Sequence, residues 1–216
     1  MTIKTQLKGD RDVFLKDKRV NNIVNLLLED DTIVYDQIIK LIQSTRDFDS
    51  FLIQISSLMN LIDTDLQELF WDYIEHLNGI YNNNNLCDNL RGAVLEKFVY
   101  KLLESKYYEN SNIYVSCYVI IRGRRSQKTV DVFYYSCDRN IGESFECKVS
   151  PHHFEKDHLI NLKDIFFKSD ESIQPSIACF TDEEAIKLKI KDLKTTLGPI
   201  KIFGRENLKR ILLEDN

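Results

Sequence analysis

The chain has 216 residues, 43% of them hydrophobic and 29% charged, which excludes wholesale disorder and is typical of a globular protein of one or two domains. Its formal net charge of −5 does not by itself indicate a nucleic-acid binder. No apolar run approaches the roughly 20 residues that span a bilayer, and the amino terminus has no apolar core typical of a signal peptide, so we expect no membrane association.

The acidic residues are concentrated in the first part of the chain. Residues 1–86 hold 8 Lys or Arg and 14 Asp or Glu, whereas residues 87–216 hold 21 and 20. Apolar residues recur at helical spacing in the first part, which predicts helices over 11–29, 32–43, 47–60 and 64–79. We therefore expect an acidic α-helical segment over 1–86 with no catalytic pattern. Its apolar stripes and charge suggest contact with a protein partner or a second copy of the chain, or masking of the basic site.

Four consecutive Asn residues, 82–85, favour a turn and mark the boundary to a second domain over 87–216. Helices are predicted over 89–106, 153–168, 182–195 and 205–213. Strands rich in β-branched and aromatic residues are predicted over 113–121, 129–135, 143–149, 175–180 and 199–203. The order predicts an α+β or α/β fold in which three strands form an antiparallel meander and a later strand is added through a right-handed crossover.

Charged residues interrupt two of these apolar strands. Asp131 lies in the second strand of the meander, and Glu146 and Lys148 lie in the third. Residues two apart in a strand face the same side, so Glu146 and Lys148 project together, and pairing of the two strands can bring Asp131 beside them. Two close carboxylates repel, and a divalent cation resolves that repulsion. The cluster therefore suggests a metal site with a lysine beside it.

This arrangement resembles the PD-(D/E)XK, or restriction-endonuclease-like, nuclease superfamily. The matching features are a helix that carries Glu96, then Val130-Asp131, then Glu146-Cys147-Lys148, in the order helix, three strands, helix, strand. The resemblance covers residues 88–180, or up to 203 with the last strand, and implies a restriction-endonuclease-like core. Val130 replaces the proline of the motif, and the second helix lacks the Gln-x-x-x-Tyr pattern of the RecB-like branch.

The resemblance also implies an activity, a cofactor and a role for each residue. Mg²⁺, replaceable by Mn²⁺, would be bound by Asp131, Glu146 and the main-chain carbonyl of Cys147, and Glu96 would help to hold it. Lys148 would activate or position the attacking water. The reaction that the resemblance implies would be phosphodiester hydrolysis, of DNA rather than RNA, in defence against foreign DNA or in DNA processing.

A basic run between the first two strands adds a candidate contact for the nucleic-acid backbone. It consists of Arg122, Arg124, Arg125 and Lys128. Such contacts give affinity that depends on salt but not on base sequence. The simpler interpretation of a charge run is a solvated turn. Asn161 and Lys163 of the second helix are weaker candidates for the same role.

Other interpretations stay open at this level. Asp131, Glu146 and Lys148 could form a salt-bridge cluster on an exposed sheet face, and the domain could be an inactive nuclease fold that binds protein or DNA. Cys147, His152 and His153 lie close enough in sequence for a zinc site, although the paired spacing of zinc modules is absent. His152, His153 and His158 could suggest a histidine-based nuclease, but no matching motif accompanies them.

Overall fold

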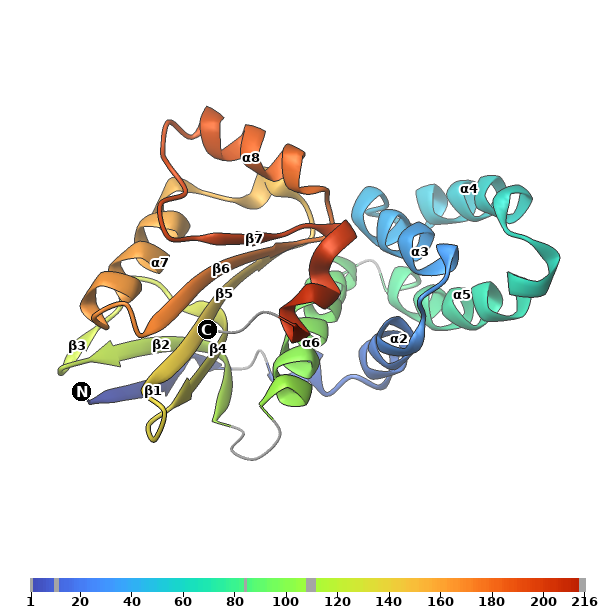
Figure 1. Ribbon diagram of the computed structural model, residues 1–216. Helices are drawn as coiled ribbons and strands as arrows, with labels where there is room; N and C mark the ends of the chain where they lie inside the picture. Colours follow the sequence, from blue (N-terminus) through green and yellow to red (C-terminus); the bar gives the residue numbers. More distant parts are fainter. Residues whose placement is uncertain (1, 10–11, 84, 108–111, 214–216) are drawn as a thin grey trace. The chain divides into compact units, whose positions relative to one another are not determined.

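The structure, a computed structural model, describes residues 2–9, 12–83, 85–107 and 112–213 (Figure 1). It divides into two compact units. The sheet unit comprises Met1–Asp12 and Val99–Asn216, and the helical unit comprises Val13–Phe98. The boundary expected at residues 86 and 87 is thus placed differently, because the first twelve residues join the sheet unit and helix α6, Cys87–Lys106, runs through both.

The helical unit contains the helices expected from the apolar spacing. They are α1 (Asp12–Leu15), α2 (Lys18–Glu29), α3 (Ile33–Ser44), α4 (Phe48–Leu58) and α5 (Gln67–Tyr81), with 3₁₀ turns η2 (Met59–Leu61) and η3 (Thr64–Leu66). The stretch expected as one helix over 11–29 is divided, because the Asp17 side chain accepts the backbone N–H of Arg19 and caps a new helix there. Among the described residues, no helix has the length and apolarity that a bilayer crossing requires.

The expectation that residues 1–86 are entirely helical is wrong at the amino terminus. Residues Ile3–Leu7 form strand β1, which pairs antiparallel with β2 (Ile113–Ile121), from Ile3 opposite Ile121 to Leu7 opposite Cys117. A five-residue stretch is too short for its periodicity to distinguish strand from helix. Its conformation is fixed by a partner more than one hundred residues later in the chain, which local sequence does not reveal.

The sheet unit is a mixed α+β arrangement in the predicted element order (Figure 1). After α6 come β2 (Ile113–Ile121), β3 (Arg124–Arg125), β4 (Val130–Ser136), β5 (Ile141–Lys148), η4 (Pro151–His153), α7 (Lys156–Lys168), β6 (Ile173–Cys179), α8 (Glu183–Asp192), β7 (Lys201–Phe203) and the 3₁₀ helix η5 (Arg205–Leu212). The sheet order is β1-β2-β4-β5-β6-β7, with β3 paired to β2. The β2–β4–β5 meander is antiparallel and the β5–β6–β7 part is parallel, as predicted.

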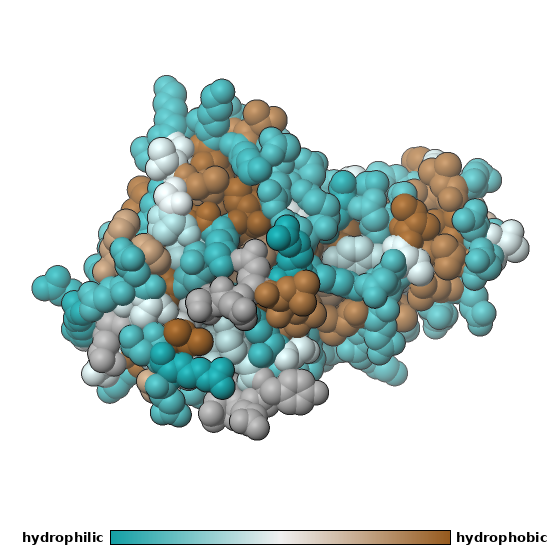
Figure 2. All heavy atoms as spheres, in the orientation of Figure 1, coloured by the Kyte–Doolittle hydropathy of each residue, from teal (hydrophilic) through white to brown (hydrophobic). Residues whose placement is uncertain are grey.

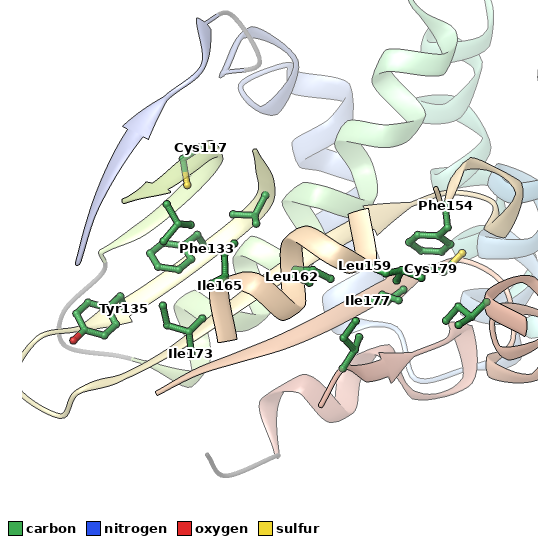
Figure 3. Packing of buried hydrophobic residues seen from close by; sticks show 14 of the residues in the cluster. Cys117, Phe133, Tyr135, Phe154, Leu159, Leu162, Ile165, Ile173, Ile177 and Cys179 are labelled. Atoms are coloured by element: carbon green, nitrogen blue, oxygen red, sulfur yellow. The ribbon is translucent and has the colours of Figure 1, made fainter. Parts of the chain in front are cut away.

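Both faces of the sheet are covered. On one face, α7 buries Leu159, Leu162 and Ile165 against strand residues that include Phe133 and Ile177 (Figure 3). The alternate residues point to the other side. There Tyr134 stacks on Tyr107, which follows α6, with ring centroids 3.7 Å apart, and Glu143 is buried. By strand alternation, Asp131, Glu146 and Lys148 belong to the face that α7 covers.

An irregularity in β2 lies opposite Asp131. The ladder between β2 and β4 pairs Val115 with Val132 and Cys117 with Val130, and Ser116 between them has a positive φ of 45°. After this residue the alternation of β2 shifts, because Tyr114 and Cys117 both pack into the core beneath α7. Asp131 therefore lies at a local interruption of the ladder, a kind of irregularity that is frequent near active sites.

Candidate active site

The three motif residues converge as the strand pattern predicts. The Nζ atom of Lys148 lies 2.5 Å from Oε1 of Glu146 and 3.0 Å from Oδ2 of Asp131. The β4–β5 register pairs Val132 with Phe145, so Asp131 and Glu146 are the next residues across from one another. Two carboxylates from adjacent strands and one ammonium group thus form a compact cluster at the end of β5.

The cluster is largely withdrawn from solvent. The side chain of Glu146 is 3% exposed, that of Asp131 19% and that of Lys148 21%. Burial disfavours the charged form of Lys148, but the two carboxylates outweigh burial and raise the pKa of its ammonium group above the usual range. At neutral pH Lys148 is therefore a cation. One alternative was a salt-bridge cluster on an exposed sheet face. The structure differs from it, because these ion pairs lie on the face that α7 covers.

Asp131 is also fixed to the backbone of the neighbouring strand. Its Oδ2 atom accepts the N–H of Cys147 at 2.8 Å as well as the Lys148 ammonium. The carboxylate of β4 therefore holds the middle residue of the Glu-x-Lys motif, whose carbonyl is the predicted metal ligand. The Cys147 side chain is buried. It projects to the side opposite Glu146, because successive side chains of a strand point to opposite faces of the sheet.

A histidine that the motif does not include lies beside the cluster. The Nε2 atom of His158, in the first turn of α7, is 3.6 Å from Oε1 of Glu146. Its Nδ1 atom accepts the backbone N–H of Glu155 at 3.1 Å in a reciprocal capping box, so the neutral ring carries its proton on Nε2, toward Glu146. Burial, followed by the charges of Lys148 and Lys128, lowers the pKa of His158.

The position of His158 beside the cluster is indicated by sequence features outside the nuclease motif. Only seven residues separate Lys148 from Lys156, where α7 begins, so the first turn of α7 has to lie near the end of β5. The pattern Glu155-x-x-His158 at that point is a helix-capping arrangement. Together, these two observations predict a histidine beside the motif, but not in the role of the histidine-based nucleases.

The four basic residues of the predicted turn do not lie together. Arg122 pairs with Asp170 beyond the carboxyl end of α7, whereas Lys128 contacts Glu155 at its amino end, with Nζ 2.9 Å from Oε2. Because α7 has 13 residues, these two positions are separated by about 20 Å. Arg124 is exposed, and Arg125 lies over the ring of Tyr118 with its Cζ atom 4.3 Å from the ring centroid. Of the four, Lys128 is connected to the motif cluster, through Glu155 and His158.

Asn161 and Lys163, the weaker candidates for phosphate contact, are engaged within the chain. The Asn161 amide is buried and exchanges two hydrogen bonds with the backbone of Lys128, at 3.1 and 3.2 Å. These two hydrogen bonds hold the basic turn against α7. The ammonium group of Lys163 donates to the carbonyl of Thr196. Both residues therefore have structural partners in this arrangement.

Glu96, the predicted fourth acidic residue, lies on α6 in the helical unit and is buried. Its side chain has interactions of its own. Because it belongs to the unit other than the one that holds Asp131, its contact with the metal stays a prediction.

The described residues bring together no group of three or more His, Cys, Asp or Glu side chains suited to a metal ion. The zinc site considered for Cys147, His152 and His153 is therefore not formed in the part of the chain that the structure describes. Two carboxylates alone remain at the motif. That set is too small for zinc, but it suits Mg²⁺, which commonly binds one or two carboxylates and keeps several water ligands.

Comparisons with known proteins show a similarity in fold only. No protein-family model matches the sequence, and a search of curated proteins gives no match. The structure is similar to that of protein VC1899 from Vibrio cholerae, with a TM-score of 0.50 at 14% identity. A second similar structure is Can2 from Sulfobacillus thermosulfidooxidans in complex with cyclic tetra-adenylate, with a TM-score of 0.45 at 14% identity. Each similarity covers 98% of this chain but only 57% of the other protein.

Proposed function

We propose that the chain is a metal-dependent nuclease of the PD-(D/E)XK type that hydrolyses phosphodiester bonds. One observation carries the proposal: Asp131 from one strand and Glu146 and Lys148 from the next form a single, largely buried cluster on one sheet face, with Glu146 at its buried end. These are the residues that the sequence resemblance selects, and the fold has the order of elements that the resemblance implies.

A purely structural role explains this cluster poorly. The cluster places two carboxyl groups beside one ammonium group beneath α7. Removing charges from water costs several kcal/mol per ion, and apolar side chains often serve a core equally well or better. A second carboxyl group beside the pair that Lys148 and Glu146 form is explained more simply by a cation that the protein binds.

The two carboxylates and the Cys147 carbonyl are the groups that would hold Mg²⁺, and hard oxygen ligands suit Mn²⁺ equally. When bound, the ion would lower the pKa of a water molecule and neutralise charge on the scissile phosphate. The hydrogen bond from Cys147 N–H keeps Asp131 directed at the strand that bears the other ligands. In the same way, His158 holds a proton toward the Glu146 carboxylate.

Lys148 is the residue proposed to act on the attacking water and on the scissile phosphate. As a cation it cannot be a metal ligand, and the adjacent carboxylates keep it protonated, so it orients the water and stabilises negative charge on the phosphate. Glu96 is proposed to complete the metal site or to hold its water ligands.

The substrate and setting are proposed from the resemblance. DNA is preferred to RNA, with a role in defence or DNA processing. A cytoplasmic location is proposed from the five cysteines, an odd number without a Cys-x-x-Cys pair. The basic run supplies Arg124, Arg125 and Lys128 as proposed contacts for the phosphate backbone, and Arg122 is left out because it pairs with Asp170. The proposal is tested by incubating the purified chain with end-labelled single-stranded DNA, double-stranded DNA and RNA, in Mg²⁺, in Mn²⁺ and in EDTA. Cleavage of at least one substrate that requires the metal is expected. Cleavage that is equal in EDTA would contradict the metal requirement, and no cleavage of any substrate would favour the inactive nuclease-fold interpretation.

A further inference from the structure

Helix α4 of the helical unit has apolar residues on both sides. Phe51 and Ile55 are buried inside the unit. Leu52 and Ile53 of the same helix are exposed, Ile53 to 69%, and so is Met59, which follows in η2. A helix that is polar on its solvent side needs no further partner, but several exposed large apolar side chains close together in the chain are typical of an interaction site.

Two more large apolar side chains that follow α4 in the chain are exposed. Leu61 in the turn η2 is 68% exposed, and Trp71 in α5 is 45% exposed and touches Phe70 edge-on. Figure 2 shows apolar side chains gathered on the helical unit, bordered by hydrophilic ones. Tryptophan is enriched in the energetic centres of protein interfaces. We call α4, η2 and the start of α5, residues 48–71, the α4–α5 arm.

The charge around this arm has one sign. The sequence has no Lys or Arg from residue 47 to residue 90, and the seven Asp and Glu residues between 47 and 76 are all exposed. The carboxylates of Asp17, Asp36 and Asp88, which take part in ion pairs in this unit, all lie outside the arm. The arm therefore presents uncompensated negative charge beside exposed apolar side chains.

We propose that the α4–α5 arm is the docking surface for a partner protein that presents a basic amphipathic helix. Apolar side chains of that helix would cover Leu52, Ile53 and Trp71, and its Lys or Arg residues would meet the carboxylates. Nucleic acid is excluded at this surface by like charge. A second copy of the chain that docks through the same arm would bring two acidic surfaces together, which the charge also disfavours.

The test uses the full chain and a fluorescent synthetic helix with Leu on one face and Lys on the other, measured by anisotropy without metal or nucleic acid. Two reference peptides have the same length, one with Glu in place of Lys and one with the Leu and Lys positions scrambled. We expect the basic amphipathic peptide to bind the arm, and Ile53→Ser with Leu52→Ser to weaken binding on the order of tenfold. Neutralisation by Asp63→Asn with Asp65→Asn should reduce both the affinity and its dependence on salt.

Leu188→Ser is the matched control, because Leu188 is equally exposed but lies on α8 in the sheet unit. It should leave the affinity unchanged, and circular dichroism should show that every variant is folded. Equal binding by wild type and the α4 variant, or by the scrambled peptide, would overturn the proposal. So would sedimentation that shows a wild-type dimer which the α4 variant converts to a monomer, since the occupant would then be a second copy.

Discussion

The carboxylate of Asp131 accepts the backbone N–H of Cys147 at 2.8 Å, at the point where the β4–β5 ladder ends. A side chain thus continues the pairing that the backbone of β4 has stopped making. The contact fixes the position of the Asp relative to Glu146 and Lys148, which flank Cys147. The geometry of the candidate site is therefore built into the strand pair, rather than left to flexible loops.

The Asp131 hydrogen bond allows metal binding to be separated from folding. In Asp131→Asn the amide oxygen can still accept the Cys147 N–H, so thermal stability should change little, while the loss of one anionic ligand should weaken Mn²⁺ binding on the order of tenfold or more. Calorimetric titration with Mn²⁺ measures the difference. Equal affinity in the two proteins would remove Asp131 from the metal site.

The basic turn gives a prediction about nucleic-acid affinity. Arg124→Glu with Arg125→Glu should weaken binding to DNA of every sequence and lower the slope of log affinity against log salt by about one for each phosphate that the variant no longer neutralises. Arg122→Glu is the control, because Arg122 is already paired with Asp170 at the far end of α7. If the double variant binds DNA as tightly as wild type at low salt, the run is a solvated turn.

Strand β1, which the periodicity of the sequence does not reveal, gives a matched pair of substitutions. Ile3 is partly buried against the core beneath α7, whereas Leu7 in the same strand is exposed. Ile3→Ser should lower the free energy of unfolding of the sheet unit by about 1–3 kcal/mol, and Leu7→Ser by less than about 0.5 kcal/mol. Chemical denaturation followed by circular dichroism compares them. Equal effects would mean that β1 contributes little to the sheet.

His158 makes two contacts, with the start of α7 and with Glu146, that different substitutions can separate. His158→Ala removes the reciprocal cap of α7 and should cost about 0.5–2 kcal/mol of stability. His158→Gln should restore the cap, since Gln is a usual capping-box residue, but it does not restore the ring beside Glu146. Activity that remains low in a fully stable Gln variant would identify His158 as a positioning residue for Glu146. Full activity in both variants would mean that the role of His158 is only to cap α7.

Much of the fold can be predicted from periodicity. The strand over 113–121 is found with both ends as predicted, and α3, α5, α7 and β4 lie within a few residues of their predicted bounds. These elements are long or strongly patterned, so local sequence decides them. Strand β1 escapes such prediction because its conformation depends on β2, and the helix expected over 205–213 is a 3₁₀ helix, η5.

The candidate site is predictable to the extent that strand alternation determines it. Alternation places Glu146 and Lys148 on one side, and the meander brings Asp131 beside them. The partners of the basic turn are not predictable, because Arg122 and Lys128 pair with residues at opposite ends of a later helix. Three-dimensional pairing of this kind has no local sequence signal.

The central claim is that Asp131 and Glu146 bind a catalytic metal, while Lys148 orients the attacking water and stabilises negative charge on the phosphate. Its most direct test is plasmid cleavage measured beside Mn²⁺ titration and thermal unfolding for wild type, Lys148→Ala and Glu146→Gln. Lys148→Ala should retain metal binding and lose cleavage by about 10²-fold or more, and Glu146→Gln should lose both. If Lys148→Ala cleaves as wild type does, the role assigned to Lys148 is contradicted. If Lys148→Ala only lowers stability and no protein, wild type included, shows metal-dependent cleavage, the cluster is a structural salt bridge and the whole claim is contradicted.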